Sequence, residues 1–213
     1  MAAVEHGFAL QGAGRALGPG VLGLHVPDGG FHVKAAGLPL ARLYVAVKLN
    51  ANFPANGARR GLPTIQGVLV LSDGETGRPL ALMDSMEITV LRTGAATAVG
   101  ADDEYKVEIE PALMAAGTIV VDSLEQCATI GDLHHALASG VLSPRDVHAV
   151  LADVVAGRRP GRTSAGEITI FDSTGVAIED VAAAAAVYER AIAAGRGLTL
   201  DLAGSGPGPP PGS

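Results

Sequence analysis

Residues 43–50 read LYVAVKLN, and this run decides the fold of the first half of the chain. Side chains of a strand alternate between the two faces of its sheet. One face of this run therefore carries, in order, Tyr44, Ala46, Lys48 and Asn50. The side chains between them are all Leu or Val, so the other face is wholly apolar. This alternation predicts a strand with one polar position, Lys48, placed between hydrophobic neighbours.

Further strand signals lie on both sides of this run. They occur at residues 32–36, 64–72 and 78–83. The connections are short and turn-like, which predicts an antiparallel sheet. A helix is expected over residues 2–17, followed by a Gly/Pro-rich passage without a strand to about Gly30. Asp84 or Ser85 should cap a helix over residues 87–99.

The second half alternates short helices with buried strands. Helices are expected at 110–116, 133–138, 143–157 and 176–194, and strands at 118–122 and 167–171. The helix from Ser143 has a Ser cap, a proline in its first turn and an acid three residues on. The predicted class is α+β: a mainly antiparallel sheet with packed helices, joined to a short α/β part.

Composition excludes several functions for the 213 residues. The net charge is −7, aromatic residues make up 3%, and no basic run occurs, so nucleic-acid binding is not expected. A single cysteine, Cys127, excludes a disulfide framework, and no metal-ligand spacing is found. No apolar run reaches the roughly 18 residues of a membrane span. We expect a cytoplasmic protein that does not bind membranes.

Three basic residues are candidates for chemistry. Lys34, on the preceding strand, lies close enough across a hairpin to share the face of Lys48, and Arg92 lies on the following helix. Two ammonium groups in one cleft suit the binding of a carboxylate or the activation of an imine. Arg92 offers a bidentate fork for a carboxylate. From spacing alone, solvent exposure is the commoner state of a strand lysine, and of Arg92 as well.

Two other motifs give weaker evidence of function. Gly12-Ala13-Gly14 follows a helix-like segment rather than a strand, so we do not assign it to a dinucleotide. Asp102 and Lys106 lie in a polar segment, ADDEYKVEIE, which pattern alone assigns to an ordinary surface loop.

Several motifs in one order resemble the ornithine cyclodeaminase/mu-crystallin family. They are GGFHVKAAGL (29–38), the stretch from YVAVKLN to RTGAATAV (44–99), VGADDEYK (99–106) and FDSTGVAIEDVAAAA (171–185). The similarity covers residues from about 4 to 200. It implies NAD(P)-dependent enzymes that act on amino acids, keto acids or cyclic imines and dimerise through the substrate domain.

The chain departs from this family at one point. RTGAATAV runs directly into GAD, where the family carries a complete Rossmann domain of on the order of 100 residues. The glycine-rich loop is lost with it, so we expect no cofactor. The implied division is 1–98 (substrate and dimerisation domain), 99–160 (truncated remnant of the dinucleotide domain), 161–203 (return to the substrate domain) and 204–213 (disordered tail).

The resemblance also assigns roles to residues. It maps the catalytic lysine onto Lys48, the carboxylate-binding arginine onto Arg92 and the catalytic aspartate onto Asp102, and it places Lys48 in a pocket. The remaining substrate-binding positions are Lys34, Gln66, Lys106 and Ser173. Glu104-Tyr105 stand where the family has Pro-Gly before the lysine.

These features predict a cofactor-independent, non-redox enzyme. Asp102 would act as base, Lys48 as acid and Arg92 as carboxylate anchor in imine or enamine chemistry, such as cyclisation, isomerisation or addition to a small amino or keto metabolite. A non-catalytic small-molecule binder resembling mu-crystallin is the alternative, and a degenerate scaffold is a third. A homodimer is expected.

Overall fold

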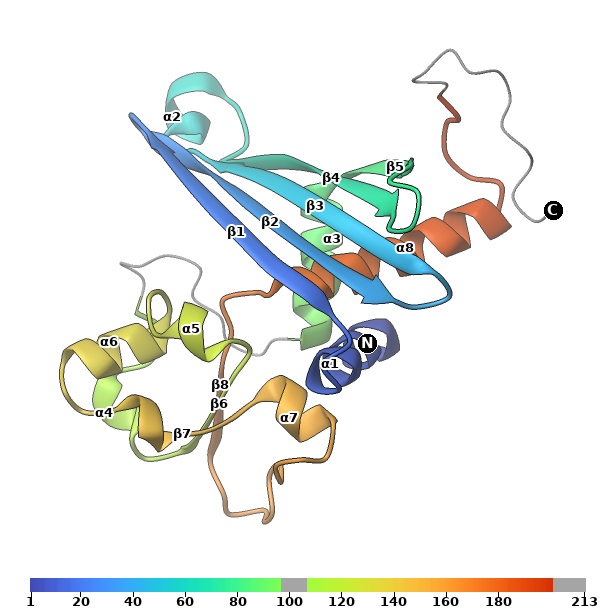
Figure 1. Ribbon diagram of the computed structural model, residues 1–213. Coiled ribbons are helices and arrows are strands. Elements are labelled where there is room, and N and C mark those ends of the chain that lie inside the picture. The colour runs from blue at the N-terminus through green and yellow to red at the C-terminus, as the bar shows by residue number, and fades with distance from the viewer. Residues whose placement is uncertain (97–106, 201–213) are drawn as a thin grey trace.

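The computed structural model describes residues 1–96 and 107–200, and Figure 1 shows an antiparallel sheet above a smaller helical part. The sheet has the order β1-β2-β3-β4-β5, and every neighbouring pair is antiparallel. Its strands are β1 (Leu17–Val26), β2 (Gly29–Pro39), β3 (Leu43–Asn52), β4 (Ile65–Asp73) and β5 (Pro79–Asp84). A short helix, α2 (Asn56–Arg60), follows β3.

The register of the sheet confirms the alternation read from the sequence. Lys34 of β2 lies directly opposite Lys48 of β3, and Lys48 lies opposite Leu69 of β4. Tyr44 and Ala46, on the same face as Lys48, are buried in the main core, and Leu69 has no exposed surface. This inner face is therefore the one that the helices cover.

Three helices pack on the inner face: α1 (Ala2–Gly12), α3 (Ser85–Ala96) and α8 (Ala177–Ala193). Figure 1 shows α8 running beneath the sheet with α3 and α1 beside it. Every residue of α8 from Ala177 to Ala185 is buried, and Ala182 contributes to the contact with α1 at Gly7. The small alanine side chains allow α8 to lie close to the strands, and this brings its first turn to Lys48.

A second, parallel sheet lies below the first. Its order is β7-β6-β8, with both neighbouring pairs parallel. The elements here are α4 (Pro111–Met114), β6 (Thr118–Val121), α5 (Leu124–Cys127), α6 (Asp132–Ala138), a 3-10 turn (Pro144–Asp146), β7 (Val147–Val150), α7 (Leu151–Val155) and β8 (Thr169–Asp172). The structure thus combines an antiparallel and a parallel sheet, in agreement with the mixed class expected. Cys127 is buried in the core of this part.

Two local predictions are wrong. The Gly/Pro-rich passage contains β1, which forms a full edge strand on β2 despite its glycines because edge strands tolerate such residues. The segment 143–157 is not one helix. Its Ser143 cap forms, but the helical turn ends at Asp146, and Val147–Val150 pairs with β6 as a strand. The pairing of β-branched residues in a buried sheet outweighs the helix-start signal.

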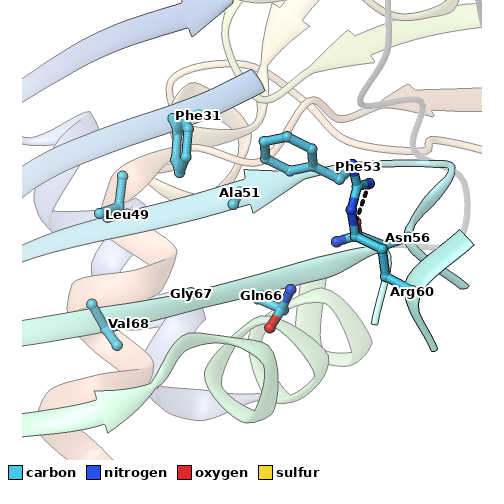
Figure 2. A pocket seen from close by; sticks show the side chains of 9 residues that line it. All are labelled: Phe31, Leu49, Ala51, Phe53, Asn56, Arg60, Gln66, Gly67 and Val68. Carbon is cyan, nitrogen blue, oxygen red and sulfur yellow. Dashed lines mark hydrogen bonds between the residues drawn. The ribbon is translucent and has the colours of Figure 1, made fainter. Parts of the chain in front are cut away.

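The outer face of the antiparallel sheet is apolar and exposed. Its uncovered side chains are Leu22, Leu24, Val47, Leu49, Val68 and Leu82. A hollow of about 610 Å³ lies on this face. Figure 2 shows Phe31 and Phe53 at one side of it and Arg60 at the rim, where its Nη1 donates to Asn56 Oδ1. In the described part of the chain, no helix has the length and apolar character needed to cross a bilayer.

Candidate functional site

The site is built around two neighbouring lysines on the inner face. Lys34 and Lys48 are directly opposite in the register of β2 and β3, so their side chains emerge side by side beneath the sheet. Lys48 is only 3% exposed. It is therefore a buried residue rather than a solvated strand lysine, and a buried ammonium group requires partners.

The first turn of α8 supplies the partner of Lys48. Its Nζ lies 2.8 Å from Asp180 Oδ1 and 2.7 Å from Oδ2, and both side chains are nearly fully buried. Burial lowers the pKa of Lys48 to about 8, although the Asp180 carboxylate acts to raise it. At neutral pH the ammonium form still dominates, so Lys48 carries a proton that can be given to a ligand.

Arg92 of α3 reaches the same turn of α8. Its Nη1 donates to Glu179 Oε2 at 3.2 Å, and its Nε lies 3.6 Å from Asp180 Oδ1. The guanidinium side chain is 12% exposed and Glu179 is fully buried. Burial raises the pKa of Glu179, while the Arg92 charge lowers it. Arg92 is therefore a largely buried side chain, fixed by its ion pairs with Glu179 and Asp180, and not a surface charge.

Lys34 links the site to the loop after β8. Its Nζ donates to the carbonyl oxygens of Thr174 (3.1 Å) and Gly175 (2.6 Å). Burial, and then the Arg92 charge, lower the pKa of Lys34. On the other side of this loop, Asp122 Oδ2 accepts the Gly175 N–H at 2.6 Å. The loop is thus clamped between a lysine of one sheet and an aspartate of the other.

Ser173 lies in this loop, but its hydroxyl is already engaged. Ser173 Oγ donates to Asp122 Oδ2 at 2.9 Å, and the residue is 5% exposed. To contact a substrate as predicted, the Ser173 hydroxyl would have to give up its hydrogen bond to Asp122. In the structure it acts with Asp122 to fix the loop.

The other predicted site residues are not brought to this cluster. Gln66 lies opposite Ala51 on the outer face, at the hollow of Figure 2, whereas Lys48 faces inward. Gln66 is two residues away from Val68 and shares its face, so strand alternation alone separates it from Lys48. Asp102 and Lys106 lie outside the described residues.

Residues that the sequence analysis did not select complete the cluster. Glu179 and Asp180 look in the sequence like ordinary acids of a helix first turn. Their signal is that they interrupt a run of apolar residues, VAIEDVAAAAA, which predicts burial on most sides and hence cationic partners. Asn50 also joins the inner face, where its Oδ1 accepts the buried Ser85 hydroxyl at 2.6 Å.

The arrangement can bind one carboxylate and exchange a proton. Each lysine has three N–H donors, of which the hydrogen bonds above use two in Lys34 and one in Lys48. Three cations lie near three carboxylates, because the Asp122 charge acts on Lys34 and on Glu179 in addition to the Glu179 and Asp180 contacts, and burial raises the pKa of Glu179. With Glu179 protonated, a small anion would balance the charge. Among the described residues, no group of three or more His, Cys, Asp or Glu side chains is placed to hold a metal ion.

Comparison with known proteins gives a consistent result. The model of the ornithine cyclodeaminase/mu-crystallin family matches residues 1–102 and 97–195. Alanine dehydrogenase of Archaeoglobus fulgidus is 28% identical over 293 positions, covering 90% of this chain and 90% of the relative. The solved structure of an archaeal alanine dehydrogenase dimer with bound NAD superposes with a TM-score of 0.87 and 27% identity, covering 94% of this chain and 93% of that one.

Other relatives match only one part of the chain. Iminosuccinate reductase of Paracoccus denitrificans is 46% identical over 94 residues, which are 44% of this chain and 29% of the relative. Delta(1)-pyrroline-2-carboxylate reductase of Bacillus cereus is 37% identical over 92 residues, which are 43% of this chain and 28% of the relative. The chain therefore matches less than a third of the length of these reductases. The alignment with alanine dehydrogenase has 80 more positions than this chain has residues, so at least that many lack a counterpart here.

These comparisons correct the predicted function. The expectation of a cofactor-independent, non-redox lyase or cyclase is wrong, because the relatives are a dehydrogenase and reductases, and the archaeal dehydrogenase was solved with NAD. The absence of a glycine-rich loop between RTGAATAV and GAD does not by itself exclude redox chemistry. The named relatives are enzymes, which agrees with the coarser expectation.

The carboxyl edge of the parallel sheet tests whether the described residues fit a dinucleotide. A pyrophosphate is bound by N–H donors, often at a helix N-terminus. Here Asp122 follows β6 and Asp172 ends β8, and burial raises the pKa of Asp172 to about 6. Asp172 Oδ1 is buried and has no hydrogen-bond partner among the described residues. Residues 1–96 and 107–200 thus do not fit a pyrophosphate at this edge.

Proposed function

Since the chain belongs to the ornithine cyclodeaminase/mu-crystallin family, we propose that it is the substrate-binding part of an oxidoreductase for small α-amino or α-imino acids. One observation carries the proposal. Lys34, Lys48 and Arg92 converge beneath the sheet, and all three are held by protein partners before any ligand binds. Such prearranged cations favour a carboxylate because little side-chain order is lost on binding.

The substrate carboxylate would be held by Arg92, with the spare N–H donors of the lysines around it. Reduction of an imine adds a hydride to carbon and a proton to nitrogen. We assign that proton to Lys48 Nζ, and the reverse step, oxidation of an amine, would return it. The hydride would come from NADH or NADPH and would return to the oxidised cofactor in the reverse step; because the described residues do not fit a pyrophosphate at the edge of the parallel sheet, the cofactor would be held away from that edge. The segment 107–172, with its parallel sheet, would be a shortened counterpart of the family's dinucleotide domain.

The test is a binding and turnover measurement on the full chain. Calorimetric titration with L-proline, L-alanine and pyruvate should give binding, and the methyl ester of L-proline should bind at least about 100-fold more weakly because it lacks the carboxylate. Absorbance of NADH and NADPH should fall with Δ1-pyrroline-2-carboxylate, iminosuccinate, or pyruvate with ammonia. Equal binding of acid and ester, with no cofactor consumed at millimolar substrate, would overturn the proposal.

The outer sheet face would be covered by a second copy of the chain. Its exposed apolar side chains lie on β1, β3, β4 and β5, and a contiguous exposed apolar patch is typical of an interaction surface. The solved archaeal alanine dehydrogenase is described as a dimer, which supports the same state here. Sedimentation equilibrium should give twice the chain mass of 21.4 kDa, and Leu49→Glu should give the single mass. A wild-type monomer at micromolar concentration would contradict this part.

A further inference from the structure

The first turn of α8 contacts both Lys48 and Arg92. Asp180 binds Lys48 through both carboxylate oxygens, and its Oδ1 also lies 3.6 Å from Arg92 Nε. The neighbouring Glu179 takes the other side of the Arg92 fork. Asp180 is buried: its Oδ1 accepts the Lys48 hydrogen bond, and its Oδ2 lies 2.7 Å from the same Nζ with no hydrogen-bond partner among the described residues.

We propose that Asp180 is the positioning residue of the site: it keeps the Lys48 ammonium group charged and directed at the substrate, and it holds Arg92 beside it. The proton-transfer role of Lys48 rests on the proposed function above. The effect of Asp180 on Lys48 does not, because it exists in the free protein.

The electrostatic surroundings of Lys48 show why one carboxylate decides its state. Burial is the largest effect and disfavours the ammonium form, and the Arg92 and Lys34 charges act in the same direction. Asp180 is the group that opposes them, by its charge and by its hydrogen bond. With Asp180 neutralised, a buried lysine would face two cations, and its neutral amine would prevail at neutral pH.

The chain is well suited to a direct measurement of this state. It has three lysines, Lys34, Lys48 and Lys106, so labelling with [13Cε]lysine gives three NMR signals. The Lys48 signal is assigned by its loss in Lys48→Arg. Titration without ligand then yields the pKa of Lys48 in wild type, in Asp180→Asn and in Asp180→Glu. Glu75→Gln, which removes an exposed carboxylate from the turn between β4 and β5, is the matched control.

The expected wild-type pKa is about 8. In Asp180→Asn the pKa of Lys48 should fall by at least about one unit, and in Asp180→Glu it should lie between the two. Glu75→Gln should match wild type. An unchanged pKa in a folded Asp180→Asn overturns the proposal. Should that variant fail to fold, Asp180→Glu decides: a pKa below wild type supports positioning, and an identical pKa overturns it.

Turnover gives the second readout where an imino-acid substrate is reduced. Asp180→Asn should lower kcat by about 100-fold or more and move the pH optimum to lower pH, in step with the Lys48 pKa, while Asp180→Glu restores part of the rate. A fall in kcat without a shifted pH profile would mean a merely structural role. Absence of all turnover in wild type would contradict the proposed function but leave the NMR result standing.

Discussion

Replacement of Lys48 by methionine is expected to destabilise the fold by about 3–5 kcal/mol, although methionine fills a similar volume. The reason is the partner left behind. Asp180 is buried, and without the ammonium group it retains only the longer contact to Arg92 Nε. Breaking a buried ion pair on one side leaves an uncompensated charge, which costs more than the pair contributes. Urea denaturation of wild type and variant at pH 7 measures the difference.

A double-mutant cycle separates this effect from lost packing. Lys48→Met combined with Asp180→Asn removes both charges, so the double variant should be more stable than Lys48→Met alone by at least about 1.5 kcal/mol. Strict additivity of the two substitutions would show that the ion pair is not coupled, contrary to the contacts described.

The pH dependence of wild-type stability follows from the same residue. The pKa of Lys48 is near 8 in the folded chain and near 10.5 when unfolded. Between these values the unfolded chain binds more protons, so Lys48 should make stability rise with pH over this window. Lys48→Met should lack this rise.

The sheet and its inner face were predictable because they depend on local alternation. LYVAVKLN fixes which side chains share a face, and Lys34 follows from the hairpin geometry. The two strands that were not predicted, β1 and β7, depend on pairing with other strands. β1 is stabilised by the whole length of β2, and Val147–Val150 by a strand that lies about 25 residues earlier, so neither shows in its own residues.

The site was predictable only on its cationic side. Lys48 and Arg92 received their site roles from the family resemblance, because spacing alone favours solvent exposure for both, whereas Glu179 and Asp180 resemble ordinary acids of a helix first turn until α8 is placed under the sheet. The position of Gln66 on the outer face could have been predicted from the sequence. It lies three residues before Leu69, the residue opposite Lys48, so strand alternation places Gln66 and Lys48 on opposite faces of the sheet. The non-redox prediction was wrong for a different reason. It was based on the absence of the Rossmann segment, and that absence gives no information on the chemistry of the residues that remain.

Gly175→Ala is expected to weaken carboxylate binding by at least about 100-fold. Gly175 has φ of +76°, and a Cβ built there would overlap the Nη1 and Nη2 atoms of Arg92. The guanidinium would have to leave Glu179, which is fully buried and would lose its cationic partner. The substitution thus displaces Arg92, the proposed carboxylate anchor, without altering a charge. Titration with L-proline or pyruvate measures the loss.

The matched control for this substitution is Gly77→Ala. Gly77 has φ of +73°, and nothing lies within 4 Å of its added Cβ, so the control carries the same left-handed strain, roughly 1–2 kcal/mol, with no clash. Any extra destabilisation of Gly175→Ala over Gly77→Ala measures the displacement of Arg92. In an Arg92→Met background, Gly175→Ala should cost little more than Gly77→Ala, because Glu179 has already lost its cationic partner and methionine can bend away from the loop. Equal stability and equal ligand affinity in the two alanine variants would show that Arg92 is neither held by this loop nor the anchor of the substrate.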